Sequence, residues 1–200
     1  MTALPLQPQP QPRPLLTVAE YTALPENGGG ARYELVEGNL VMSPRPIGTH
    51  QHCIHELLYQ LRGQIPAQLV GIAEVDVDLG LAPPGQPGFV RVPDLVVVPR
   101  EAMDQQRRQG GLFHASEVGL VVEVVSPGSR RLDTVVKRDE YADAGIPHYW
   151  VVDLGEPGDR PQLTAHHLAG EFGYTDAGPV DGVFAATEPF PVRIDLGALV

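Results

Sequence analysis

Two carboxylates stand beside or within the most apolar segments of this sequence. Asp94 directly precedes segment 95–98, and Glu123 lies inside segment 120–125. A carboxylate in an apolar strand costs several kcal/mol unless it is paired, hydrogen-bonded or bound to a metal ion. Each of the two alone could equally be a turn or sheet-edge residue. Because the two segments are expected to form neighbouring strands, we predict that Asp94 and Glu123 share one site.

Lys137 is the only lysine of the chain. The 14 Lys and Arg residues are otherwise all arginine. A lysine ammonium is compact and responds to burial, whereas a guanidinium stays charged and suits bidentate contacts. The count alone favours a chance survivor on a solvated helix, since lysine is usually exposed. Lys137 shares a predicted helix face with Asp133 and Tyr141, however, through spacings of four residues. We expect it to reach the carboxylates, with a surface ion pair to Asp133 as the alternative.

The segment between Glu123 and this helix could bind phosphate. Ser126 opens a Ser-Pro-Gly-Ser turn, and Arg130 and Arg131 precede the predicted helix. Backbone N–H groups at a helix start and arginine side chains both bind phosphate oxygens. A solvated helix start explains the two arginines equally well.

Positioning these residues requires strands and helices in a mixed order. Thr17 and Glu20 have the spacing of a capping box and predict a helix over 17–24. Apolar periodicity predicts two further helices, over 50–62 and 132–144. The predicted strands are 32–35, 40–42, 69–79, 95–98, 120–125, 148–154, 162–169 and 192–194. This order favours an α/β domain with a central mixed β-sheet flanked by helices.

The composition is typical of one globular domain. We predict a single domain over residues 15–200, after a disordered Pro/Gln-rich tail at 1–14. The net charge of -11 argues against a non-specific nucleic-acid binder, which would normally be basic. Cys53 is the single cysteine, so an internal disulfide and a cysteine metal cluster are excluded. The N-terminus lacks a signal-like apolar stretch and no segment has the length of a membrane span, so a cytoplasmic location is expected.

Five motifs follow one another along the chain. They are Tyr33-Glu34-Leu35-Val36-Glu37-Gly38-Asn39-Leu40-Val41-Met42-Ser43-Pro44 with His50, Pro93-Asp94, Val122-Glu123-Val124-Val125-Ser126-Pro127, Asp133-x-x-x-Lys137-x-x-x-Tyr141, and Gly145-Ile146-Pro147-His148-Tyr149-Trp150-Val151-Val152-Asp153. This set resembles the Uma-two family of bacterial endonucleases, within the restriction-endonuclease-like, PD-(D/E)xK nuclease superfamily. The resemblance implies a restriction-endonuclease-like core with an N-terminal helix and a β-hairpin extension.

The resemblance also implies a metal-dependent site. Asp94 and Glu123 would bind Mg²⁺ or Mn²⁺, helped by a backbone carbonyl just after Glu123, and such ions prefer hard oxygen ligands. The superfamily pattern expects a lysine two residues after the glutamate, where this chain has Val125. The resemblance implies that Lys137 replaces it as the catalytic lysine. The supporting candidates are Glu37, which could instead be an ordinary turn residue, together with His50, Ser126, Asp133 and Tyr141.

These expectations favour a Mg²⁺-dependent phosphodiester hydrolase, a DNA endonuclease that forms a homodimer as related nucleases often do. No membrane partner is expected. The alternative is an inactive protein of nuclease fold that binds nucleic acid or another protein. The overall acidity and Val125 favour this alternative, whereas the retained carboxylates and Lys137 argue against it.

Overall fold

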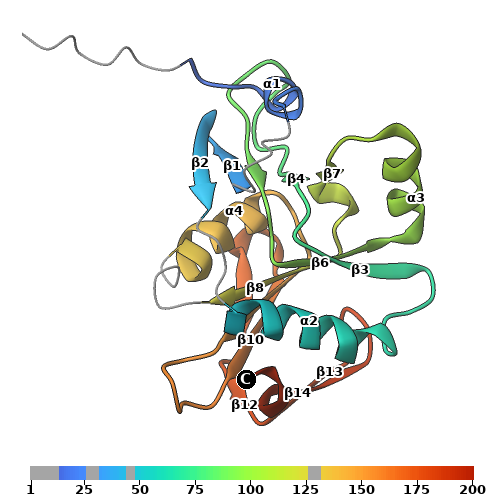
Figure 1. Cartoon of the computed structure of the whole chain (residues 1–200), viewed down its shortest axis with the longest axis vertical. Helices are drawn as coiled ribbons and strands as arrows, with labels where there is room; N and C mark the ends of the chain where they lie inside the picture. The colour runs from blue at the N-terminus through green and yellow to red at the C-terminus, as the bar shows by residue number, and fades with distance from the viewer. Residues whose placement is uncertain (1–13, 26–31, 44–47, 126–131) are drawn as a thin grey trace, which may run out of the picture.

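The computed structural model describes residues 14–25, 32–43, 48–125 and 132–200, so the tail predicted at 1–14 lies outside the description apart from Pro14. The described strands form a seven-stranded sheet, a five-stranded sheet and a two-stranded hairpin (Figure 1). The seven-stranded sheet contains β3 (Leu69–Ala73), β6 (Leu95–Pro99), β8 (Leu120–Val125), β9 (His148–Asp153), β10 (Gln162–Leu168), β11 (Tyr174–Asp176) and β12 (Val180–Asp181). The parallel pair β8–β9 lies among antiparallel pairs, which confirms the predicted mixed sheet.

The four described α-helices are α1 (Val18–Thr22), α2 (Gly48–Arg62), α3 (Arg100–Gln109) and α4 (Lys137–Asp143), the last preceded by the π-helical turn η2 (Leu132–Val136). Three of them, α2, α3 and α4, contact the central sheet, as predicted, whereas α1 lies against the five-stranded sheet, where the Tyr21 hydroxyl donates to the Tyr33 carbonyl. Three short 3-10 turns complete the description: η1 (Ala115–Glu117), η3 (Gly170–Phe172) and η4 (Leu196–Leu199). Within the described ranges, no helix has both the length and the apolarity needed to cross a membrane.

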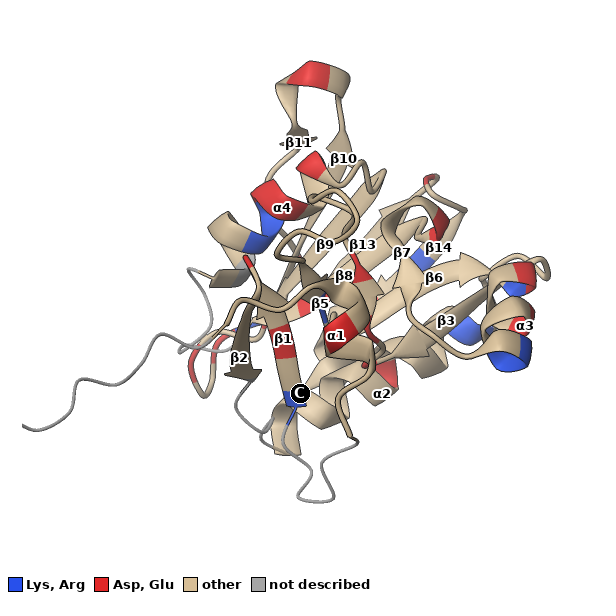
Figure 2. Ribbon diagram, turned by 90° about the horizontal axis from the view of Figure 1, so that it is seen from above, with Lys and Arg blue, Asp and Glu red and all other residues tan. Residues whose placement is uncertain are grey.

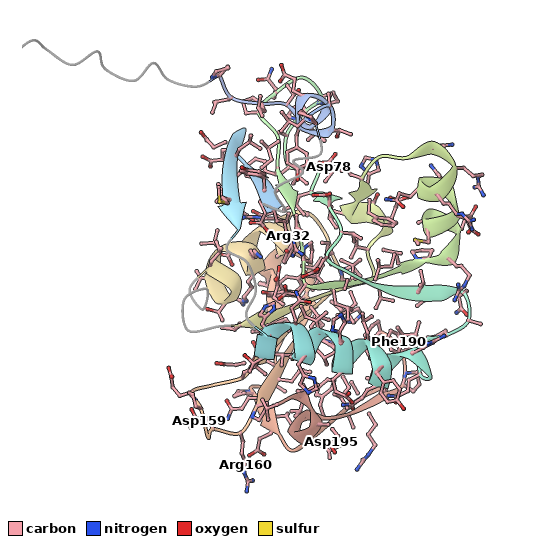
Figure 3. The ribbon with its side chains drawn as sticks, in the orientation of Figure 1. Arg32, Asp78, Asp159, Arg160, Phe190 and Asp195 are labelled. Atoms are coloured by element: carbon pink, nitrogen blue, oxygen red, sulfur yellow. The ribbon has the colours of Figure 1, made fainter. Side chains whose placement is uncertain are left out.

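Alternation along the central strands produces two separate cores. Val122 and Val124 of β8 pack with buried residues of α2 and of the hairpin β13 (Val183–Ala186) and β14 (Val192–Asp195). Val121 and Val125 point to the opposite face, where they pack with α3 and α4. Successive side chains of a strand face opposite sides, so Glu123 shares the second face with Val121 and Val125. In Figure 3, Phe190 of this first core is labelled beside the C-terminal end of α2.

The N-terminal hairpin belongs to a second sheet rather than standing as a simple extension. This sheet has the order β2-β1-β5-β4-β7 and consists of β1 (Arg32–Val36), β2 (Asn39–Ser43), β4 (Val77–Asp78), β5 (Val90–Arg91) and β7 (Phe113–His114). Its β1 pairs with β5 through Leu35 and Val90, a contact between segments far apart in sequence. Local sequence signals predicted the hairpin but not β5, the strand that joins it to β4.

One predicted strand is divided between the two sheets. The sequence pattern indicated a continuous strand over 69–79, but β3 ends at Ala73 and β4 begins at Val77. Between them Glu74 adopts a φ of 57°, which non-glycine residues rarely do. Its carboxylate is held by Arg32 at 2.7 Å and by Gln51 at 2.6 Å. The chain therefore leaves the central sheet at Glu74, directly beside the backbone of Asp94, whose carbonyl accepts the Glu74 N–H.

Candidate active site

Strands β6 and β8 bring the two predicted carboxylates together. Their antiparallel register pairs Leu95 with Val122, and Asp94 directly precedes Leu95 while Glu123 directly follows Val122. The Asp94 carboxylate accepts a hydrogen bond of 2.7 Å from the backbone N–H of Val124. Asp94 is therefore fixed within one peptide unit of Glu123. Both residues are buried.

Helix α4 covers the sheet face that carries Glu123. The Lys137 ammonium donates to Glu123 Oε1 at 2.9 Å, and the Tyr141 hydroxyl donates to the same oxygen at 2.7 Å. Lys137 is only 6% exposed and Tyr141 is fully buried, so Lys137 is not a solvated surface lysine. Burial, and then the charge of Glu123, raise the pKa of Tyr141 well above its usual value. Tyr141 is therefore a neutral hydrogen-bond donor that orients Glu123.

Glu34 of β1 is a site residue that the sequence argument did not select. Its Oε1 lies 3.5 Å from Lys137 Nζ and accepts a hydrogen bond of 3.2 Å from the backbone N–H of Val92. Burial alone would raise the pKa of Glu34, but the charges of Lys137 and Arg91 outweigh it and lower that pKa. A carboxylate inside a short apolar strand was the signal available in the sequence, the same signal that identified Glu123.

Arg91 of β5 connects Glu34 to α4. Its Nη1 donates to Glu34 Oε2 at 2.8 Å, while Nε and Nη2 donate to the two oxygens of Glu140 at 2.6 and 2.7 Å. The Arg91 side chain is 2% exposed. The two carboxylates raise the pKa of Arg91 despite the opposing effect of burial. Nothing in the local sequence distinguished Arg91 or Glu140 from solvated charges.

His50 approaches the site from α2. Its Nε2 lies 3.0 Å from the carbonyl oxygen of Val124 and 3.2 Å from Asp94 Oδ2. Both neighbours are acceptors, so Nε2 carries a proton in this arrangement. The structure thus places His50, predicted as a supporting residue, beside Asp94 and at the peptide that follows Glu123.

The oxygen atoms of this site fit a Mg²⁺- or Mn²⁺-type ion by their chemistry. Asp94 and Glu123 supply carboxylates, and the Val124 carbonyl is the backbone oxygen just after Glu123. Among the described residues, no three His, Cys, Asp or Glu side chains are grouped to hold a metal ion. Mg²⁺ matches such a sparse set, since it usually binds one or two carboxylates and keeps several waters. An ion bound to both Asp94 and the Val124 carbonyl would compete with the His50 hydrogen bond.

The remaining predicted residues are not part of this described arrangement. Glu37 is exposed in the β1–β2 turn with a φ of 49°, and none of the described contacts joins it to the site. Glu34, three residues earlier, takes the place expected of Glu37. Ser126, Arg130 and Arg131 lie outside the described residues. The backbone of Asp133 belongs to η2, but its side chain is likewise outside the description.

Comparisons with known proteins agree with this arrangement of elements. The sequence matches the model of the Uma2 family, described as "Putative restriction endonuclease", over residues 18–192. The fold is similar to the crystal structure of "a putative nuclease belonging to DUF820" from Anabaena variabilis, with a TM-score of 0.64 and 17% sequence identity. That similarity covers 92% of this chain and 97% of that chain, and at this identity it concerns the fold. No curated protein matches the sequence. Because the family match extends from α1 to β14, the chain belongs to the Uma2 family.

Proposed function

We propose that this protein is a Mg²⁺- or Mn²⁺-dependent phosphodiester hydrolase that cleaves DNA, built on a restriction-endonuclease-like core. One observation carries the proposal. Lys137 is buried with its ammonium 2.9 Å from Glu123, and Asp94 of the neighbouring strand is bonded to the peptide that follows Glu123. Two carboxylates and a lysine from separate elements thus converge on one short stretch of β8. Burying charges costs desolvation free energy even when they are paired, and buried charge clusters are found preferentially at functional sites.

Asp94, Glu123 and the Val124 carbonyl are the groups that would hold the divalent ion. When bound, such an ion neutralises phosphate charge and lowers the pKa of a coordinated water. The protein's own contribution is orientation. The Val124 N–H fixes the Asp94 carboxylate, and Tyr141 and Lys137 fix one oxygen of Glu123. A site whose charged groups are held in advance stabilises developing charge without reorganising during the reaction.

Lys137 acts in this proposal as a fixed cation beside the scissile phosphate. Two carboxylates, Glu123 at 2.9 Å and Glu34 at 3.5 Å, surround its ammonium, and nearby negative charge favours the charged form of an amine. The ammonium can therefore donate hydrogen bonds to a phosphate oxygen or to the attacking water. A guanidinium in its place would carry the same charge in a larger, planar group that this buried position was not shaped to hold.

DNA is the proposed substrate because the Uma2 family model is described as "Putative restriction endonuclease", and a homodimer would provide one site for each strand. The chain carries a net charge of -11, so bound DNA must meet local positive groups rather than a basic surface. Figure 2 shows Lys and Arg positions on α3 and α4 interspersed with acidic ones. We therefore expect weak, strongly salt-dependent binding in the absence of a divalent ion.

A cleavage assay with matched variants tests this proposal. Plasmid and single-stranded DNA are incubated with Mg²⁺ or Mn²⁺ and with wild type, Asp94→Asn or Glu123→Gln. The control is Asp78→Asn, a partly buried carboxylate of β4 that caps the N–H of Gly80. Each site variant should lose cleavage by about 100-fold or more, as when one group that stabilises developing charge is removed. The control should cleave like the wild type.

Two results would contradict the proposal. Equal cleavage by all four proteins would locate the activity in a contaminant. An absence of cleavage by the wild type, together with no heat on titration with Mn²⁺, would favour a protein of nuclease fold that binds a partner without hydrolysis. A heat of Mn²⁺ binding that disappears in Asp94→Asn would locate the ion at this carboxylate.

A further inference from the structure

The five-stranded sheet reaches the proposed catalytic lysine through a chain of buried charges. Glu34 of β1 lies 3.5 Å from Lys137, Arg91 of β5 binds Glu34, and Glu140 of α4 binds Arg91. Lys137 and Glu140 are both residues of α4. The contacts therefore close a ring, from α4 through β5 and β1 back to α4. Glu123 of the central sheet meets this ring at Lys137, whose ammonium donates to Glu123 Oε1 at 2.9 Å.

We propose that Glu34, held by Arg91, is a positioning residue that fixes the Lys137 ammonium against Glu123. The proposal rests on the proposed function of Lys137 in phosphodiester cleavage. It makes the N-terminal hairpin part of the working site, although the hairpin lies outside the central sheet. A hairpin that served only to cover the domain would not need to present a buried carboxylate to α4.

The contacts of Glu34 show that it acts through Lys137 rather than as a ligand of its own. Its Oε2 is engaged by Arg91 at 2.8 Å, and its Oε1 receives the Val92 N–H at 3.2 Å. The remaining direction of Oε1 faces Lys137. A carboxylate neutralised by a buried guanidinium is a weak ligand for a metal ion. It is still well placed to hold an ammonium, because opposite charges 3.5 Å apart attract each other strongly where water is largely excluded.

Arg91 supplies the rigidity that positioning requires. Its planar guanidinium meets Glu140 through two parallel hydrogen bonds, a geometry that fixes both distance and rotation. Glu140 follows Lys137 by three residues, so the two project from neighbouring positions of α4. Arg91 thus fixes the helix, and Glu34 fixes the end of the lysine that the helix carries. The long, flexible lysine side chain would otherwise have several rotamers available.

The lone lysine of this chain allows a direct test that does not depend on catalysis. Protein labelled with ¹³C at lysine Cε gives one side-chain signal, which belongs to Lys137. Its chemical shift and the hydrogen exchange of its ammonium protons report how firmly the group is held. The variants are Glu34→Gln, which keeps the size of the side chain, and Glu140→Gln, which loosens Arg91 without touching Lys137. The control is Asp78→Asn, from the same sheet.

The expected result is a displaced, faster-exchanging Lys137 signal in Glu34→Gln, with a smaller change in Glu140→Gln and none in the control. The rate of cleavage by Glu34→Gln should fall by about 10- to 100-fold, as expected for a misplaced catalytic group, with Mn²⁺ affinity unchanged. A purely structural role would lower the thermal midpoint but leave the Lys137 signal of the folded protein in place. If Glu34→Gln does not fold, Arg91→Lys and Glu140→Gln give the same comparison.

The outcomes separate this proposal from the proposed function. An unchanged Lys137 signal in Glu34→Gln overturns the positioning role, whatever the cleavage assay shows. A displaced signal with undiminished cleavage overturns it as well, because the reaction would not require the position. If the wild type cleaves nothing, the proposed function fails, while the signal still decides whether Glu34 holds Lys137.

Discussion

Replacing Lys137 by methionine separates the cost of its burial from its contribution to catalysis. Methionine fills much of the same space without the charge, so Glu123 and Glu34 lose a common cation at 2.9 and 3.5 Å. Removing one partner of a buried ion pair typically costs about 3–5 kcal/mol of unfolding free energy. We expect the lower end, about 3 kcal/mol on the same scale, because Tyr141 still donates to Glu123 and Arg91 still compensates Glu34.

The measurement combines urea unfolding with the cleavage assay. A loss of about 3 kcal/mol leaves a typical domain folded at 25 °C, so both readouts are accessible for Lys137→Met. Cleavage should fall by about 100- to 1000-fold, the usual loss when one charge-stabilising group is removed. Lys137→Arg should retain more stability, losing about 1–3 kcal/mol through overpacking, yet cleave almost as poorly as the methionine variant.

Each arm of this experiment can refute the reasoning independently. If Lys137→Met unfolds at the same urea concentration and with the same slope as the wild type, Lys137 is not held in a buried ion pair. If its stability falls but cleavage is retained, the lysine has a structural role and the proposed catalytic role is wrong. If Lys137→Arg cleaves like the wild type, only the charge matters and the argument from ammonium size fails.

Three further predictions concern the surroundings of the site. Tyr141→Phe should cost about 1.5–3 kcal/mol in urea unfolding, because it removes a buried hydrogen bond of 2.7 Å to the charged Glu123, and an unchanged midpoint would contradict this contact. The pKa of Glu34 is lowered below 4.5 by folding, so its stabilising effect is present above that pH and is lost as the pH falls further. Acid unfolding of Glu34→Gln should therefore be less steep than that of the wild type, and parallel curves would exclude the effect. Gly88→Ala should lower the free energy of unfolding by about 1–3 kcal/mol, because overpacking would push α1 away. The added Cβ would lie 2.5 Å from Val18 Cγ2 and 2.9 Å from the Val18 backbone nitrogen. A wild-type melting temperature would contradict this close approach.

The sequence predicted those parts of the fold that depend on local patterns. Apolar runs identified β6 and β8, and the capping box at Thr17 identified α1, whose reciprocal hydrogen bonds with Glu20 are present. Helix α3 was missed because its residues 100–109 are mostly polar and only Ala102 is buried. The break at Glu74 was missed because it depends on side-chain contacts with distant residues. Long-range pairing, which no local pattern encodes, decided both the division of that strand and the second sheet.

The same difference between local patterns and long-range contacts applies to the residues of the site. Asp94, Glu123 and Lys137 were recognisable because each is an unusual residue for its local setting, a carboxylate beside valines or a lysine in an arginine-rich chain. Arg91 and Glu140 are ordinary for theirs, since charged residues are common on strand edges and helix surfaces. Their partnership, formed across 49 residues of sequence, exists only in three dimensions. The local sequence therefore carries a signal for Asp94, Glu123, Lys137 and the overlooked Glu34, but none for Arg91 and Glu140, which compensate the buried charges through long-range contacts.

The position of the lysine follows from which residues β8 must bury. Val125 lies two residues after Glu123, on the same face of the strand, and is 1% exposed in a core that includes Tyr141 and Tyr149. A lysine at this point would have to place its stem and its charge within that apolar core, which is costly unless the ammonium is paired there. Helix α4 packs on the same face, so a lysine in its first turn can reach Glu123 from above the core. In the proposed site, Lys137 would thus supply from α4 the ammonium that the superfamily pattern places at Val125, and its 2.9 Å contact with Glu123 is the observation that supports this proposal.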